Sequence, residues 1–190
     1  QVVKTLTNAM ENLHKKEKLE HMNQILSDLY VRDSVTGLYN RMGYQKLSIS
    51  YFTIMREKKM PVLVMFIDLD RLKYINDTFG HEYGDFAIVS IAKAMLKHCD
   101  ADAIAARTGG DEFIVLEGAK DEESGRVLAQ KIRTELSKTQ RAMQLPFDLS
   151  ASIGAVVAHP GEENVLESYV KRAEMLMYEE KAEKKVSRDS

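Results

Sequence analysis

Residues 105–117 read AARTGGDEFIVLE, and this stretch decides the fold that we expect for the chain. An apolar run at 103–106 precedes Gly109-Gly110, and a second apolar run at 113–116 follows two acids. Two apolar runs joined through Gly-Gly predict a β-hairpin, because glycine supplies the positive φ angles that tight hairpin turns need. The adjacent acids Asp111 and Glu112 repel each other and add nothing to a core, so they indicate that a cation binds beside the hairpin.

A second acidic site lies upstream, after residues 62–67, which form a continuous apolar run. Such a run without alternation predicts a strand buried on both faces. Asp68-Leu69-Asp70 follows it directly. Mg²⁺ is usually held by one or two carboxylates together with substrate phosphates. If the two strands are neighbours, Asp68 converges with Asp111 and Glu112 on a magnesium site, but the sequence leaves their adjacency open.

The composition fits one good-sized domain with an appendage, since the chain has 190 residues. The net charge of −2 gives no bulk attraction to nucleic acid or to an anionic membrane, so we predict neither partner for this fragment. No apolar run approaches the roughly 20 residues that span a bilayer. We expect a cytoplasmic piece of a longer protein that could be membrane-anchored upstream. The lone cysteine, Cys99, fits a reducing compartment and is expected to be a buried structural thiol.

The remaining elements are expected to alternate helices with strands, which predicts an α/β (α+β) sandwich with helices packed on a sheet. Residues 1–32 form a charged segment with a broken apolar seam, expected as an N-terminal signalling or dimerisation helix, or as a helix that only caps the domain. A domain at 33–190 follows. The elements expected within it are a helix capped by Asn40, two helical segments punctuated by Gly80 and Gly84, a helix at 121–139, a strand at 149–157 and a last helix at 163–185.

Several motifs together resemble one known family, the GGDEF family of diguanylate cyclases. The resemblance covers roughly residues 31–186 in the order that the family has. Its motifs are DSVTGLYNR at 33–41, DLDRLK at 68–73, Asn76-Asp77, Gly80-His81, Gly84-Asp85, RTGGDEF at 107–113, SASIG at 150–154, and Tyr178 with Lys181.

This resemblance implies a palm-like nucleotide-cyclase fold, with a central, mostly antiparallel sheet flanked by helices. It implies condensation of two GTP molecules into cyclic di-GMP with release of two pyrophosphates. The reaction would take place between two antiparallel domains of a homodimer, with two Mg²⁺ ions (Mn²⁺ possible) and with an upstream sensory domain as a further partner.

The resemblance also implies roles for individual residues. Metal ligands would be the Asp68 carboxylate, the Leu69 carbonyl, Asp111 and Glu112, and the last two would also be the catalytic residues, with Asp111 lowering the barrier to deprotonation of the 3′-hydroxyl. The expected substrate-binding residues are Lys73, Asn76, His81, Asp85, Gly109, Gly110, Lys181 and Lys185. Simpler interpretations remain for some of these: a helix cap for Asp85, a turn residue for Asn76, a structural loop histidine for His81, and helix-dipole complementation for the C-terminal lysines.

The chain departs from the family pattern at some positions. The sequence DADA at 100–103 replaces the R-x-x-D product-inhibition site, so we predict no tight feedback by cyclic di-GMP there. Leu72, Met42, Glu174 and Lys185 replace a phenylalanine, an arginine, an aspartate and an arginine. The alternatives to an active cyclase are a silent GTP-binding module that regulates a partner domain and, more distantly, an enzyme that uses ATP.

Overall fold

The computed structural model describes residues 14–16, 18, 22, 30–162 and 165–189. The predicted N-terminal helix at 1–32 lies mostly outside the described residues, as does the predicted start of the last helix at 163. No described helix is long and apolar enough to cross a membrane.

A four-stranded antiparallel sheet forms the centre of the molecule, in the order β2-β3-β1-β4. Its strands are β1 (Val62–Leu69), β2 (Ile104–Arg107), β3 (Glu112–Gly118) and β4 (Ala151–Ala158). The predicted hairpin at 103–116 is confirmed, because β2 and β3 pair with Ala106 opposite Ile114. Strand β1 lies between β3 and β4, so its apolar run is covered on both faces and every residue in it is buried.

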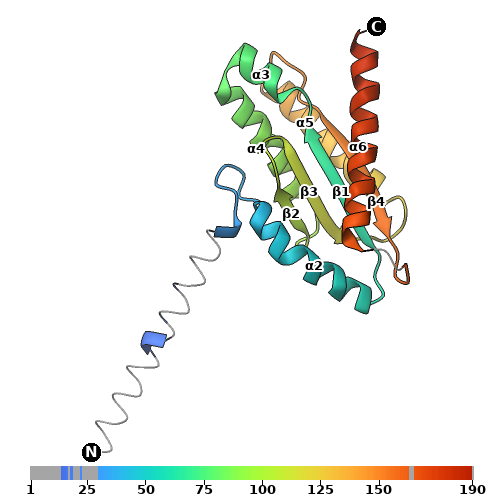
Figure 1. The fold of residues 1–190 in the computed structure, drawn as a ribbon. Helices are drawn as coiled ribbons and strands as arrows, with labels where there is room; N and C mark the ends of the chain where they lie inside the picture. The colour runs from blue at the N-terminus through green and yellow to red at the C-terminus, as the bar shows by residue number, and fades with distance from the viewer. Residues whose placement is uncertain (1–13, 17, 19–21, 23–29, 163–164, 190) are drawn as a thin grey trace, which may run out of the picture.

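Helices cover both faces of this sheet and produce the predicted sandwich (Figure 1). The helices are α2 (Arg41–Glu57), α3 (Leu72–Phe79), α4 (His81–His98), α5 (Ser124–Ala142) and α6 (Leu166–Asp189). Alternate β1 residues point into two separate cores. Leu63 and Met65 belong to the core under α3, α4 and α5, whereas Val62 and Val64 belong to the core under α2 and α6.

The start of α2 is as predicted, since the Asn40 side chain accepts a hydrogen bond from the backbone N–H of Gly43. The prediction for residues 76–85 is wrong in one respect. Gly80 alone separates α3 from α4, with φ of 94°, whereas Gly84 lies inside α4. A Cβ atom on Gly84 would come within 1.9 Å of the Asn76 side-chain oxygen, so this glycine permits close packing of two helices instead of breaking one.

The turn of the hairpin also differs from the prediction. Gly109 and Gly110 are not among the glycines with positive φ in the described chain, which are Gly37, Gly80 and Gly161. A Cβ atom on Gly109 would lie 2.6 Å from the Glu112 carboxylate, while Gly110 has open space around it. The first glycine is therefore explained by close approach of a side chain, not by backbone handedness.

Candidate functional site

The acidic residues of the two central strands lie side by side. Asp68 pairs with Glu112 in the register of β1 with β3, and the N–H of Leu69 donates to the carbonyl of Asp111 at 2.9 Å. The adjacency that the sequence left open is therefore present. Two strands whose polypeptide segments are far apart in sequence bring three carboxylates to one end of the sheet.

Asp68 is almost completely buried, with 4% of its surface exposed. Its carboxylate accepts a hydrogen bond from the ammonium group of Lys181 on α6 at 2.7 Å. Burial raises the pKa of Asp68; the Lys181 hydrogen bond and charge oppose this, and the charges of Asp111 and Asp70 add to it. An ionised Asp68 thus lies in surroundings where more positive charge would be favourable.

Asp70, two residues further on, is held from several sides. Ser152 donates to one of its oxygens at 2.6 Å, and Ser150 donates to the other at 2.7 Å. Lys184 on α6 lies 3.1 Å from that second oxygen. Burial acts to raise the pKa of Asp70, but the two serine hydrogen bonds and Lys184 outweigh it and lower the pKa. This carboxylate is a structural anchor for β4 and α6.

The turn between β2 and β3 is fixed by Arg107. Its guanidinium donates to the carbonyl of Gly110 at 2.8 Å and forms an ion pair with Asp33 at 3.3 Å. Asp33 in turn accepts hydrogen bonds from the backbone N–H and hydroxyl of Thr36. From the sequence, Arg107 is only one position of the RTGGDEF motif, and Lys184 has no assigned role in the site. Arg107 positions the turn and Lys184 contacts Asp70 through partners that are distant in the sequence.

A cavity of about 540 Å³ opens beside the acids, between the end of β1 and the last turns of α6. Its lining residues are Asp70, Arg71, Leu72, Lys73, Asp111, Lys181 and Lys185. The cavity therefore brings three predicted phosphate-binding lysines, Lys73, Lys181 and Lys185, together with Asp111. A group of cations next to paired acids suits a ligand that is itself a polyanion carrying metal.

The three residues predicted to contact the base lie on α3 and α4 and are not among the described residues that line this cavity. Asn76 is half-buried against Gly84, whereas His81 and Asp85 are exposed. The helix-cap interpretation of Asp85 is wrong, because α4 already begins at His81. Asn76 lies within α3, and its carbonyl accepts from the N–H of Gly80, so it is not a turn residue.

The donors at the strand ends fit a Mg²⁺ ion that completes its shell with phosphate. Among the described residues, no three histidine, cysteine, aspartate or glutamate side chains converge as a ready-made metal centre. Mg²⁺ does not require such a cage, since one or two carboxylates, waters and substrate oxygens suffice. The Lys181 ammonium group already contacts Asp68, close to the charges of Asp111 and Asp70. A cation can therefore bind the Asp68 carboxylate at this place.

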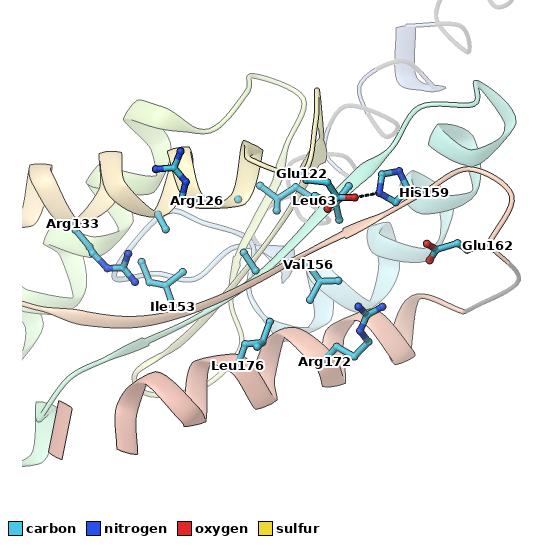
Figure 2. A pocket seen from close by; sticks show the side chains of 14 residues that line it. Leu63, Glu122, Arg126, Arg133, Ile153, Val156, His159, Glu162, Arg172 and Leu176 are labelled. Carbon is cyan, nitrogen blue, oxygen red and sulfur yellow. Dashed lines mark hydrogen bonds and ion pairs between the residues drawn. The ribbon is translucent and has the colours of Figure 1, made fainter. Parts of the chain in front are cut away.

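A second cavity, of about 500 Å³, lies along β4 between α5 and α6 (Figure 2). Two of its charged side chains are paired: Arg133 with Glu180 at 2.6 Å, and His159 with Glu122. Its floor is apolar and includes Leu63, with no acid pair or glycine turn among its described lining residues. Its described lining therefore lacks the strand-end acids that mark the first cavity.

The structure is an antiparallel sheet covered by helices, with acids at two neighbouring strand ends, and comparison with known proteins gives its family. The family model "Diguanylate cyclase, GGDEF domain" matches residues 30–187. The chain therefore belongs to the GGDEF family.

Individual relatives agree with this assignment. Diguanylate cyclase VdcA of Vibrio cholerae is 34% identical over 153 residues, which are 78% of this chain and 43% of that protein. Cyclic di-GMP phosphodiesterase NbdA of Pseudomonas aeruginosa is 27% identical over 165 residues, 87% of this chain and 21% of that protein. The chain thus spans less than half the length of these relatives.

A solved structure agrees in fold. The coiled coil and GGDEF domain of DgcB from Caulobacter crescentus, in complex with c-di-GMP, superposes with a TM-score of 0.75, and 93% of each chain is covered. At 22% identity, this likeness speaks for the fold alone.

Proposed function

We propose that this domain is a diguanylate cyclase, which condenses two GTP molecules into cyclic di-GMP and releases two pyrophosphates. The observation that carries the proposal is the adjacency of Asp68 and Asp111 beside a cavity lined by Lys73, Lys181 and Lys185. Paired acids next to a cationic cavity suit phosphoryl transfer, which depends mostly on positioning and neutralisation of charge. VdcA, a relative named as a diguanylate cyclase, supports the same activity.

In this proposal the strand-end donors Asp68, the Leu69 carbonyl, Asp111 and Glu112 hold two Mg²⁺ ions, or Mn²⁺. When bound, the metal neutralises phosphate charge and stabilises the attacking and leaving oxygens. Asp111 lowers the barrier to deprotonation of the 3′-hydroxyl, as a base or as an anchor, and Glu112 contributes beside it. The lysines of the cavity bind the phosphates, and the open space at Gly110 lets the backbone approach the nucleotide.

Choice of guanine is assigned to Asn76 and Asp85. A carboxylate accepts from the N1–H and the amino group of guanine, a pattern that adenine lacks. Asp85 is exposed on α4, and Asn76 lies on α3 against Gly84 of α4. The two residues therefore belong to two helices that pack on each other. His81, exposed at the start of α4, is a further contact in the proposal. Asp85 also argues against the ATP-using alternative.

Each domain supplies half of an active site and binds one nucleotide, so catalysis requires a homodimer of antiparallel domains. We assign residues 33–190 to the catalytic domain and residues 1–32 to a signalling or dimerisation segment that joins it to an upstream sensory domain. The matched range 30–187 is compatible with this boundary.

A silent GTP-binding module is the second candidate function. Two observations favour it: the relative NbdA is named for phosphodiesterase activity alone, and Lys185 cannot form the bidentate fork of an arginine. The two candidates differ in turnover, because only the cyclase releases pyrophosphate.

The test is incubation of the purified chain with GTP and Mg²⁺, with pyrophosphate release and nucleotide products measured across protein concentration. A cyclase formed from half-sites yields cyclic di-GMP at a rate that rises faster than linearly with protein. Binding of GTP without pyrophosphate release would support the silent GTP-binding module instead of the cyclase. Product formed from ATP would show that the substrate is ATP.

A further inference from the structure

Lys181 and Asp68 form a contact that has a consequence for metal binding. Lys181 donates to Oδ1 of Asp68 at 2.7 Å, and it is the only side chain among the described residues that hydrogen-bonds this carboxylate. The Asp68 side chain is 5% exposed, but the Lys181 side chain is 40% exposed. The acid is fixed in place, while its partner has solvent beside it into which it can move.

We propose that Lys181 is a built-in competitor of the metal: its ammonium group occupies Asp68 until a divalent cation displaces it. The inference rests on the proposed function, because it takes Asp68 as a metal ligand. It adds that metal entry and release of Lys181 are one event.

The charge balance of the site supports this exchange. Asp68 lies beside Asp111 and Glu112, so a positive charge at the strand ends is favourable whenever these acids are ionised. Lys181 supplies one charge and Mg²⁺ supplies two. Both cations cannot share Asp68 at contact distance without strong repulsion, so the arrival of the ion favours departure of the ammonium group.

The displaced side chain has a destination. Lys181 also lines the cavity that contains Lys73 and Lys185, where the proposed phosphates bind. Release from Asp68 therefore makes one more cation available to the triphosphate when metal and nucleotide arrive together. Metal without nucleotide gains nothing from that cation and must still displace it, so the competition weakens binding of metal alone.

Lys184 provides a matched comparison three residues along the same helix. It also contacts a buried acid, Asp70 at 3.1 Å, but it is additionally held by the carbonyl of Ala151 and by Glu180, both at 2.7 Å. Its acid is occupied by two serine hydroxyl groups. We infer no exchange at Lys184.

The experiment is a Mn²⁺ titration of the 190-residue chain without nucleotide, followed by electron paramagnetic resonance. Lys181→Met removes the competitor, and its Mn²⁺ dissociation constant should fall about fivefold, the upper end of what a solvent-accessible charge pair contributes. Lys181→Arg keeps a charge and should stay near wild type. The Mn²⁺ dissociation constant of Lys184→Met should also stay within about twofold of wild type, since Lys184 contacts Asp70 and not Asp68.

Thermal melting in Mg²⁺ alone gives a second measurement. Lys181→Met should melt lower than wild type without metal, because its acids repel each other uncompensated, and it should gain more from added Mg²⁺. If Lys181→Met lacks a cooperative melting transition, Lys181→Gln keeps a hydrogen-bond donor without the charge and replaces it in both measurements.

Unchanged or weaker Mn²⁺ binding in the neutral Lys181 variants, or equal tightening in Lys184→Met, would overturn the inference. These outcomes are separate from failure of the proposed function. A chain that shows the competition but releases no pyrophosphate refutes the cyclase alone, and an active cyclase without the competition refutes only the exchange.

Discussion

Asp68 and Asp70 lie two residues apart at the end of β1, yet their carboxylates have opposite surroundings. Asp70 has partners on both oxygens, from Ser150, Ser152 and Lys184. Within the part of the chain that the structure describes, Asp68 has one side-chain partner, the half-exposed Lys181. The pKa shifts follow: hydrogen bonds lower the pKa of Asp70 in spite of burial, whereas burial and neighbouring acids raise that of Asp68 in spite of its lysine.

This difference assigns separate roles to the two acids of one motif, stability to Asp70 and ligand binding to Asp68. A buried carboxylate whose two oxygens both accept hydrogen bonds from the protein, as in Asp70, stabilises the fold. A buried carboxylate whose one partner is a replaceable cation, as in Asp68, is available to a ligand. It contributes less to the stability of the fold for the same reason. We therefore expect changes at Asp70 to reduce stability and changes at Asp68 to reduce activity.

Asp68→Asn should have the largest effect on function. Loss of one metal-binding carboxylate should lower pyrophosphate release about 10²- to 10³-fold, comparable to loss of a key electrostatic group in other active sites. Its melting temperature without metal should not fall, because the ionised form is disfavoured in the folded protein. Melting by circular dichroism separates the two effects; a destabilised but active variant would reverse the comparison.

Asp70→Ala should have the largest effect on stability. Removing one partner of a buried, paired network costs about 3 kcal/mol in free energy of unfolding, which urea denaturation measures. Asp77→Ala, at an exposed acid on α3, is the control and should change little. A cost no larger than that of the control would mean that Asp70 does not anchor β4 and α6.

The contribution of Asp70 to the free energy of unfolding should also depend on pH in the acid range. Since its folded pKa lies below the unfolded value, its stabilisation is full above the unfolded pKa of about 3.9 and is lost as pH falls through the folded pKa. The stability difference between wild type and Asp70→Asn should therefore shrink as pH falls below about 4. A difference that stays constant down to low pH would show that the charge of Asp70 is not what stabilises the fold.

Gly154→Ala should weaken the placement of α6, on which both lysine contacts depend. An added Cβ atom would lie 1.9 Å from the carbonyl oxygen of Ala173 and 2.5 Å from the nitrogen of Met177, both in the α6 backbone. Overpacking of this kind costs about 1–3 kcal/mol. Stability and activity should fall together, and loss of neither in denaturation and turnover assays would contradict the close packing of β4 on α6.

Ser152→Ala and Ser150→Ala should have the smallest effects, and Ser152→Ala should cost about 1–2 kcal/mol for one lost hydrogen bond to a buried charge. Ser150→Ala should cost less, because Lys184 shares the oxygen that Ser150 contacts. Urea denaturation of both variants compares their free energies of unfolding. A larger loss for Ser150→Ala than for Ser152→Ala would mean that the hydrogen bond from Ser150, not the one from Ser152, is the main support of Asp70.

The sequence predicted the features that depend on local pattern. The continuous apolar run gave the buried strand β1, and paired runs around Gly109-Gly110 gave the hairpin. It did not predict the support of Asp70, because Ser150 and Ser152 are distant in the sequence and meet it only through β4 pairing. Adjacency of Asp68 and Asp111 depends on sheet order, for which the resemblance to a family supplied the expectation.

Glycine was the residue most easily misinterpreted. The sequence predicts that Gly84 punctuates two helical segments, but Gly84 lies inside α4, where the Asn76 side chain packs against it. Gly109 was expected for its backbone freedom and instead makes room for Glu112. Close approach and positive φ require the same residue type, and a sequence does not distinguish them.

The most direct test of the division between the two acids is the Mn²⁺ affinity of the complex with 3′-deoxy-GTP, which cannot be condensed. Electron paramagnetic resonance titrations would compare wild type, Asp68→Asn and Asp70→Asn. We predict at least about tenfold weaker binding for Asp68→Asn and a change below about threefold for folded Asp70→Asn. Equal affinities for wild type and Asp68→Asn, or a loss confined to Asp70→Asn, would contradict the account.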